Sequence, residues 1–260
     1  MNTLAFIGGG NMASAIIGGL LKSGRAPADI LVLEPNADQR SRLQRELGVI
    51  TLEAPGSVLQ RAAVVTWAIK PQNFKEAAAA CAPHVAQALQ FSVMAGIRSG
   101  DMVRALGTER VVRSMPNTPA LIGQGIAGLY ARPAIGDDER REVERLLAPT
   151  GRTLWVAREE DLDAVTALSG SGPAYVFYFV EAMMKAAQDL GLSAEQGRAR
   201  AGDLLRRGRA GTAIGRGAVG VARARHVQGR HDACRPHLAG TQRRARCDRV
   251  GRQGGRAAGA

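Results

Sequence analysis

Residues 3–13 read Thr-Leu-Ala-Phe-Ile-Gly-Gly-Gly-Asn-Met-Ala, and this stretch decides the fold that we predict for most of the chain. The apolar run at 3–7 is typical of a strand buried on both faces, and a helical pattern follows it directly. Between the two lies a Gly-x-Gly-x-x-Ala fingerprint. Gly8 permits a tight turn, Gly10 lets backbone N–H groups approach a pyrophosphate, and Ala13 lets the helix lie close to the strand. The stretch predicts a dinucleotide-binding α/β fold.

The second predicted strand, residues 30–34, completes a βαβ unit and ends in an acidic residue. Glu34 lies about 20 residues past the fingerprint glycines, where a carboxylate accepts a hydrogen bond from the adenosine ribose 2′-hydroxyl and repels a 2′-phosphate. This position favours NADH over NADPH. Asn36 and Arg40 follow closely and would soften that preference. The alternative is that Glu34 is a solvated strand end.

Further strands and helices alternate along the next 120 residues. We predict strands at 64–69, 90–94, 110–114, 125–131 and 153–156, and helices at 37–47, 77–88 and 137–147. Open α/β sheets bind ligands at the carboxyl ends of their strands. Three stretches follow strands there: Lys70-Pro71, Ala95-Gly96, whose small residues would let a flat ring lie on the backbone, and a rigid loop at 115–119. A plain solvated lysine and a structural turn are the alternatives for the first and the last.

The strand pattern ends after Val156, and the sequence then becomes helical. We predict a helix at 159–168, a break at 169–173 and a long, largely apolar helix at 174–190. A helix that is apolar on most faces is buried, often between subunits. Ser171-Gly172-Pro173 at its start offers small groups and free N–H donors that suit an anion, although a simple helix cap explains them equally well.

Bulk properties narrow the class of protein. We expect a cytoplasmic protein, because the sequence shows neither a signal peptide nor an apolar run long enough to span a bilayer. Cys81, Cys234 and Cys247 show no disulfide framework. The net charge of +12 is uneven: residues 211–260 hold eleven arginines and two aspartates, a charge of +9, which leaves +3 for residues 1–210.

Five ordered motifs resemble the pyrroline-5-carboxylate reductase family, which catalyses the last step of proline synthesis. They are Phe-Ile-Gly-Gly-Gly-Asn-Met at 6–12, Ile-Lys-Pro-Gln at 69–72, Ser-Val-Met-Ala-Gly-Ile at 92–97, Met-Pro-Asn-Thr-Pro at 115–119 and Asp-Ala-Val-Thr-Ala-Leu-Ser-Gly-Ser-Gly-Pro-Ala-Tyr at 163–175. The resemblance covers residues 3 to about 198 and implies a Rossmann-type doubly wound sheet over 1–155. An all-helical dimerisation domain would begin at 156–198 and be truncated.

The resemblance also implies site residues and a reaction. The implied ligands are NADPH or NADH and 1-pyrroline-5-carboxylate, whose C=N carbon would accept a hydride to give proline. The family's homodimer or higher homo-oligomer would be compromised in this chain by the altered tail, and the activity would be impaired. Ser171 and Gly172 would meet the substrate. The cofactor would contact Ile7, Gly8, Gly10, Asn11, Met12, Glu34, Ala68, Lys70, Pro71, Met94, Ala95, Asn117 and Thr118.

Three departures from the family pattern stand out. Glu34 replaces a residue that is often small, and Pro55 stands where an Asn contacts adenosine; both count against a preference for NADPH. The family binds much of the substrate carboxylate and imine with a later motif, Thr-Ser-Pro-Gly-Gly-Thr-Thr, which is absent. We therefore assign no catalytic residue.

The tail explains that absence. In residues 211–260, Arg, Ala and Gly make up 31 of 50 positions, and Ile214 and Leu238 are the only large aliphatic or aromatic side chains besides valine. When residues 225–237 are back-translated and the first base is dropped, G/C-favoured codons spell Val-Thr-Ser-Lys-Gly-Gly-Thr-Thr-x-Ala-Ala-Leu. We predict a frame change near 198–202 and an out-of-frame tail without stable structure over 199–260. A natural basic linker is the alternative.

This interpretation disfavours two other functions for the tail. His226, His231, Cys234, His237 and Cys247 resemble a zinc site, but their spacing is loose, so we predict no metal. The arginines resemble a nucleic-acid arm without interleaved aromatic residues, so we expect no specific nucleic-acid binding. Two alternatives remain for the whole chain: a catalytically silent nucleotide-binding protein, and another imine or β-hydroxyacid reductase on the same scaffold.

Overall fold

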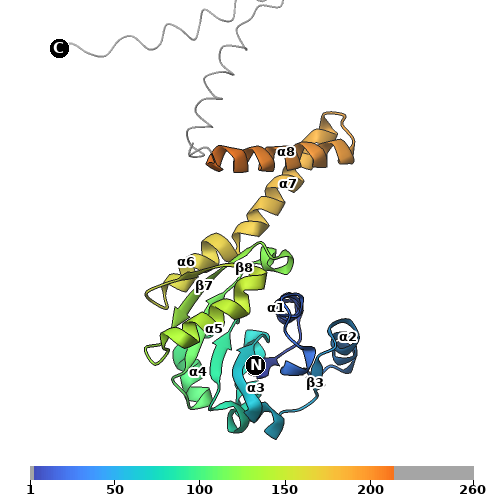
Figure 1. Cartoon of the computed structure of the whole chain (residues 1–260). Coiled ribbons are helices and arrows are strands. Elements are labelled where there is room, and N and C mark those ends of the chain that lie inside the picture. Colours follow the sequence, from blue (N-terminus) through green and yellow to red (C-terminus); the bar gives the residue numbers. More distant parts are fainter. Residues whose placement is uncertain (1–2, 214–260) are drawn as a thin grey trace, which may run out of the picture. The chain divides into compact units, whose positions relative to one another are not determined.

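The computed structural model describes residues 3–213, and its main feature is an eight-stranded sheet in the order β3-β2-β1-β4-β5-β6-β7-β8 (Figure 1). The strands from β1 to β6 are parallel to one another, β7 runs antiparallel to β6, and β8 is parallel to β7. The bounds are β1 Thr3–Ile7, β2 Ile30–Leu33, β3 Ile50–Leu52, β4 Ala62–Trp67, β5 Leu89–Ser92, β6 Val111–Met115, β7 Gly125–Ala131 and β8 Gly151–Trp155.

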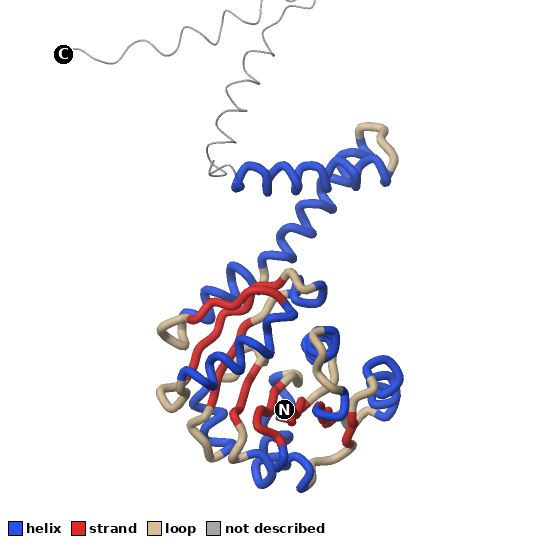
Figure 2. The backbone as a smooth tube through the Cα atoms, in the orientation of Figure 1, coloured by secondary structure: helices blue, strands red, loops and turns tan. Residues whose placement is uncertain are grey.

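Helices cover both faces of this sheet (Figure 2). One face packs against α1 (Asn11–Lys22), α2 (Ala37–Leu47) and α5 (Asp137–Leu147), and the other against α3 (Phe74–Val85) and α4 (Ser99–Leu106). Short 3-10 turns lie between them at η1 Pro27–Asp29, η2 Ser57–Arg61, η3 Pro71–Asn73, η4 Thr118–Ile122 and η5 Ala148–Thr150. The predicted doubly wound α/β class is confirmed.

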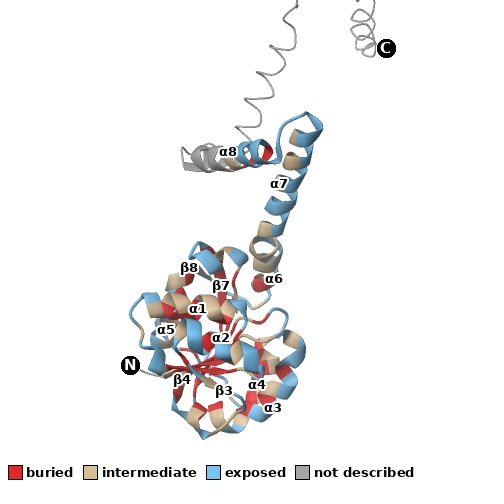
Figure 3. Ribbon diagram, turned by 90° about the vertical axis from the view of Figure 1, so that its right-hand side faces the viewer, coloured by how far each residue is buried: buried red, intermediate tan, exposed pale blue. Residues whose placement is uncertain are grey.

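The core consists of two apolar layers, one on each face of the sheet, and the strands between them are buried (Figure 3). Helix α1 contributes buried apolar side chains at Ala13, Ile16, Ile17 and Leu20, a spacing that places them on one face of a helix. The sequence did not reveal β3 or α4. β3 is a three-residue edge strand whose side chains are not fully buried, and α4 is only eight residues long.

The helical segment after β8 differs from its prediction. α6 (Asp161–Val165) continues through a π-helical turn, η6 (Thr166–Gly170), almost directly into α7 (Gly172–Asp189). The break predicted at 169–173 is therefore too long: the interruption is confined to a bend at Ser171. The N–H of Ser171 donates to the carbonyl of Thr166 at 2.9 Å, so the chain passes the glycines by widening its hydrogen bonds to i→i+5 rather than by leaving the helix.

The contacts divide the chain at Phe179 into two compact units, of which the second contains the end of α7 and α8 (Ala194–Ala213). In this second unit a side chain at Gly197 would lie 3.0 Å from Cβ of Ala187, so the glycine lets α8 approach α7 closely. Ser193 and Gln196 form a reciprocal capping box at the start of α8.

Residues 199–213 are helical, which corrects the expectation of a structureless tail over that part. Arg and Ala are strong helix formers, so the altered composition does not itself end a helix. The remaining tail at 214–260, with the histidines and cysteines of the disfavoured zinc pattern, lies outside the described residues. Within residues 3–213, no helix is both long enough and apolar enough to cross a membrane.

Candidate cofactor-binding site

The turn between β1 and α1 requires glycine at position 8. Gly8 is buried with φ +96°, and its N–H donates to the carbonyl of Leu33 at 2.8 Å. A Cβ here would lie 2.7 Å from the backbone oxygen of Ala68 and from Cγ2 of Ile69. Both the backbone conformation and the close approach of β4 therefore exclude a side chain.

Gly10 serves a different purpose, because the space around it is open. It is the exposed N-cap of α1, no side chain caps that helix, and a Cβ at Gly10 would meet no protein atom within 4 Å. Asn11 is exposed beside it and Met12 is half-buried. Helix N-termini with free backbone N–H groups bind anions. The turn thus fits the pyrophosphate of a dinucleotide, as the fingerprint predicts.

Glu34 is held at this turn by two backbone groups. Its carboxylate accepts hydrogen bonds from the N–H of Gly9 at 2.9 Å and from the N–H of Asn36 at 3.0 Å. The residue is half-buried at the carboxyl end of β2. Glu34 is therefore not a freely solvated strand end: its carboxylate is fixed beside the glycine turn, where the adenosine ribose of a bound dinucleotide would lie.

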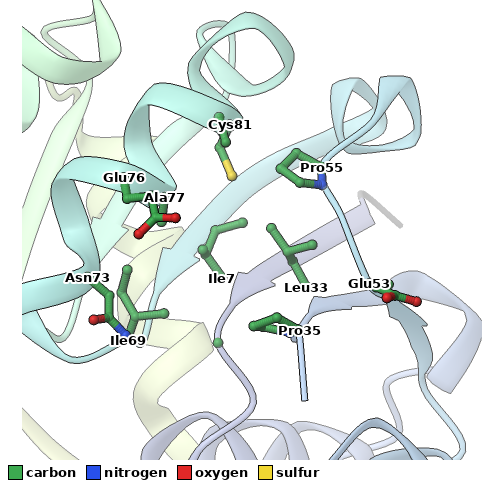
Figure 4. Close-up of a pocket in the computed structure, with 12 residues that line it drawn as sticks. Ile7, Leu33, Pro35, Glu53, Pro55, Ile69, Asn73, Glu76, Ala77 and Cys81 are labelled. Atoms are coloured by element: carbon green, nitrogen blue, oxygen red, sulfur yellow. The ribbon is translucent and has the colours of Figure 1, made fainter. Parts of the chain in front are cut away.

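A cavity of about 330 Å³ opens next to this turn (Figure 4). Side chains of α3 and the turn before it form one wall, Pro35, Glu53 and Pro55 the other, and Ile7 and Leu33 lie between them. The lining also includes Gly8, Ile69, Asn73, Glu76, Ala77, Ala80 and Cys81. The size and the mainly apolar walls suit an adenine ring.

Most of the α3 wall was missed by sequence reasoning, although a signal existed. Asn73, Ala77 and Cys81 are spaced by four residues and line the same side of the cavity. Burial raises the pKa of the Cys81 thiol to about 11, so the group stays protonated near neutral pH. Cys81 acts here as an apolar wall residue rather than a nucleophile.

The residues expected near the nicotinamide lie at the carboxyl ends of two adjacent strands, β4 and β5. Ala68 continues the pairing of β4 with β1 through its N–H, which donates to Ile7 at 2.9 Å. Met94 is buried, and its backbone N–H donates a hydrogen bond to the hydroxyl oxygen of Ser92 at 3.1 Å. Lys70 and Ala95 are exposed, and Pro71 opens η3. None of these five lines the adenosine-side cavity.

Asn117 links the loop after β6 to the π-helical turn. Its side-chain amide donates to Oγ of Ser169 at 3.1 Å, and its side-chain oxygen accepts from the N–H of Ile126 at 3.0 Å. Thr118 is exposed at the start of η4. The structure thus brings together two motifs that are 52 residues apart. Asn117 has a positioning role that the sequence did not indicate.

The substrate segment is only partly as predicted. Ser171 and Gly172 are half-buried just after the π-helical turn. The N–H of Ser171 is already used by Thr166, so it is not a free donor for an anion, because the helix continues where a break was expected. Next to it, a Cβ at Gly170 would lie 2.9 Å from the terminal methyl group of Met115, which a larger residue would displace.

A buried ion pair near the same edge of the sheet was also missed. Arg113 of β6 lies 2.6 Å from Glu159, whose carboxylate also accepts from the N–H and hydroxyl of Ser99, each at 2.6 Å. Burial by itself would raise the pKa of Glu159, but the Ser99 hydrogen bonds and Arg113 outweigh it and lower the pKa below its usual value. The ion pair links the residues just before α6 to strand β6.

Comparison with known proteins shows which family the chain is related to. A protein named pyrroline-5-carboxylate reductase from Pseudomonas aeruginosa is 42% identical over 194 residues, which cover 74% of this chain and 71% of that protein. The chain belongs to the pyrroline-5-carboxylate reductase family. The protein of the same name from Haemophilus influenzae is 43% identical over 201 residues, 75% of this chain and 72% of that protein.

Other comparisons agree with the two parts of the fold. Residues 159–213 match the family model described as pyrroline-5-carboxylate reductase dimerisation, and residues 3–96 match the model described as NADP oxidoreductase coenzyme F420-dependent. The solved structure of a pyrroline-5-carboxylate reductase from Coxiella burnetii is 30% identical, with a TM-score of 0.76 over 90% of this chain and 86% of that one. The resemblance predicted from the five motifs is confirmed.

Proposed function

We propose that this chain is a pyrroline-5-carboxylate reductase that binds NADH or NADPH at the turn between β1 and α1. The observation that carries the proposal is the open space at Gly10, before an uncapped helix N-terminus, next to a cavity of about 330 Å³. A pyrophosphate fits the helix N-terminus at Gly10, and an adenosine fits the cavity. Family membership supplies the substrate, 1-pyrroline-5-carboxylate.

In this reaction the coenzyme, when bound, supplies a hydride. The hydride adds to the C=N carbon of the substrate, the π electron pair moves to the nitrogen, which takes up a proton, and proline and the oxidised coenzyme result. The chain's own residues orient the reactants. Ala68, Met94 and Ala95, at the ends of β4 and β5, would bracket the nicotinamide and the ribose attached to it. Asn117 would hold the segment with Ser171 and Gly172 over that site.

We propose further that the helical part mediates homodimerisation. The first half of α7 exposes consecutive large side chains, of which Tyr175, Phe177 and Tyr178 are 66%, 59% and 76% exposed (Figure 3). Exposed apolar patches of this kind mark interaction sites. Their position within the stretch matched to the dimerisation model, 159–213, supports a second copy of this chain as the partner.

The chain as written would be impaired. The family motif Thr-Ser-Pro-Gly-Gly-Thr-Thr is absent from the printed sequence, and its near-equivalent at 225–237 exists in a shifted reading frame. The match to the dimerisation model ends at residue 213. We therefore propose that the cofactor half of the site is intact, while the half that holds the substrate carboxylate and imine is lost.

Coenzyme oxidation measured with 1-pyrroline-5-carboxylate tests both statements. The chain as written should bind NADH or NADPH, as monitored by coenzyme fluorescence, and turn over little or no substrate. A gene in which the frame is restored upstream of the motif should give a rate of proline formation at least about a hundredfold higher, because correct positioning of reactants contributes factors of this order.

The outcomes separate this proposal from a catalytically silent nucleotide-binding protein. Coenzyme binding by both versions with no turnover by either favours the silent protein. Full activity of the chain as written would refute the proposed impairment while leaving the reaction in place. Sequencing the codons for residues 198–202 shows directly whether the frame changes there.

A further inference from the structure

The cavity beside the glycine turn is acidic. Its lining includes two carboxylates, Glu53 and Glu76, and no lysine or arginine. Glu34 is not part of the lining: its carboxylate is fixed on the N–H groups of Gly9 and Asn36, at the glycine turn that borders the cavity through Gly8. A phosphate in this cavity would face these carboxylates without a lysine or arginine in the lining. Like charges placed together at a binding surface disfavour binding.

Arg40 is hydrogen-bonded to the backbone of Glu34, and its guanidinium group also has other partners. One guanidinium nitrogen donates to the backbone oxygens of Glu34 at 3.0 Å and of Pro35 at 2.7 Å, and another lies 3.1 Å from the carboxylate of Glu53. The arginine is 17% exposed, whereas Glu53 is 76% exposed. In dinucleotide-binding folds an arginine at this point accommodates the 2′-phosphate of NADPH.

We infer that Glu53, by pairing with Arg40, makes this site selective for NADH over NADPH, in addition to the effect of Glu34. This inference rests on the proposed function, since it takes the cavity to be the adenosine site. A 2′-phosphate would have to displace Glu53 from Arg40 and approach the carboxylate of Glu34. A free 2′-hydroxyl needs neither change and can donate to the Glu34 carboxylate. Glu53 is thus a specificity-determining residue that acts through Arg40.

The test is a fluorescence titration of the full-length chain with NADH and, separately, with NADPH. The unmodified chain should bind NADH at least about tenfold more tightly, the equivalent of one like-charge repulsion. Glu53→Gln should strengthen NADPH binding about fivefold and leave NADH binding unchanged, because it removes one repelling charge and frees Arg40. Glu53 is largely exposed, so the substitution should not affect folding.

Two further variants show whether the effect passes through Arg40. Glu46 lies in the same helix as Arg40 and pairs with Arg42. Glu46→Gln therefore removes one carboxylate charge without touching Arg40, and it should leave the ratio of NADH affinity to NADPH affinity unchanged. In Glu53→Gln combined with Arg40→Gln, the gain for NADPH should disappear; Arg40→Met, which keeps an unbranched side chain without the charge, serves as the substitute if Arg40→Gln unfolds α2.

Each contrary outcome has a defined meaning. Equal affinity of the unmodified chain for NADH and NADPH overturns the inference, as does an NADPH gain in Glu46→Gln as large as that in Glu53→Gln. A gain that persists after Arg40 is replaced shows that Glu53 acts by charge alone and also refutes the role given to Arg40. Failure of a folded chain to bind either coenzyme refutes the proposed function instead.

Discussion

The guanidinium of Arg113 and the carboxylate of Glu159 are 2.6 Å apart and almost fully shielded from water, with 5% and 14% of their side chains exposed. Replacing Glu159 with Gln leaves Arg113 buried without a counter-charge. We expect the free energy of unfolding at neutral pH to fall by about 3 kcal/mol, the usual cost of breaking a buried pair from one side. Urea unfolding followed by tryptophan fluorescence measures it. Asp161→Asn, which breaks a neighbouring exposed pair with Arg158, should cause no measurable change.

The same pair makes stability depend on pH in a defined direction. The pKa of Glu159 is lower in the folded chain than its ordinary value of 4.5, so the unfolded chain takes up the proton first as the pH falls. The stabilisation is complete above that value and is lost as the pH falls through the folded pKa. The difference between the unmodified chain and Glu159→Gln should therefore shrink below about pH 4.5. A difference that stays constant down to pH 3 would contradict the role of this carboxylate.

Gly8 and Gly10 should respond differently to alanine. At Gly8 the added Cβ meets the backbone of Ala68 at a positive φ, and we expect a loss of about 3 kcal/mol in the free energy of unfolding. At Gly10 the Cβ meets no protein atom, so stability should change by less than about 1 kcal/mol. Coenzyme affinity should nevertheless fall about tenfold in Gly10→Ala, because the methyl group occupies space that a pyrophosphate needs. Unchanged affinity would place the pyrophosphate elsewhere.

Gln90 satisfies three buried polar groups and should tolerate no apolar substitution. Its side chain accepts from the indole N–H of Trp67 at 2.8 Å and donates to the carbonyls of Val85 and Ala88 at 2.7 and 3.0 Å. Gln90→Leu leaves the buried indole N–H of Trp67 without this acceptor and removes one donor from each carbonyl, of which Val85 still accepts from the N–H of Ala88 at 3.0 Å. The expected cost is about 2 kcal/mol. Thermal unfolding by circular dichroism and the Trp67 emission maximum both report it. Gln87→Leu, at an exposed position, is the control and should unfold like the unmodified chain.

The fold was largely predictable because its signals are local. The glycine turn, the apolar strands and the helices at 37–47 and 137–147 each depend on residues close together in the sequence. Both helices have the predicted bounds, and the predicted strands lie within two residues of theirs. The same rule predicts a helix break at 169–173, but the structure shortens it to a bend at Ser171. Glycine and serine interrupt an ordinary α-helix, but a single π-helical turn carries the chain past them.

The site was less predictable, because its decisive contacts are distant in sequence. Arg113 and Glu159 are 46 residues apart, and Asn117 and Ser169 are 52 apart. Patterns at three- or four-residue spacing carry no information about such pairs. Arg40 was recognised as a residue that would soften the preference for NADH. Arg40 pairs with Glu53, which follows β3 in the chain and is 13 residues away, and only the structure shows this pair. In our inference the pairing reverses the expected effect of Arg40 on coenzyme preference.

The first half of α7 should mediate self-association of the chain. Tyr175, Phe177 and Tyr178 are exposed on the first half of the helix, and each aromatic side chain that becomes buried removes a large apolar area from water. Replacing all three with Ser should weaken association at least about tenfold in analytical ultracentrifugation. Because these side chains are exposed in the single chain, its unfolding should be unaffected. Ile122→Ser, at an equally exposed apolar position in η4 outside the matched dimerisation stretch, should leave association unchanged. If the chain is monomeric at all concentrations, or if Ile122→Ser disrupts association as strongly, α7 is not the interface.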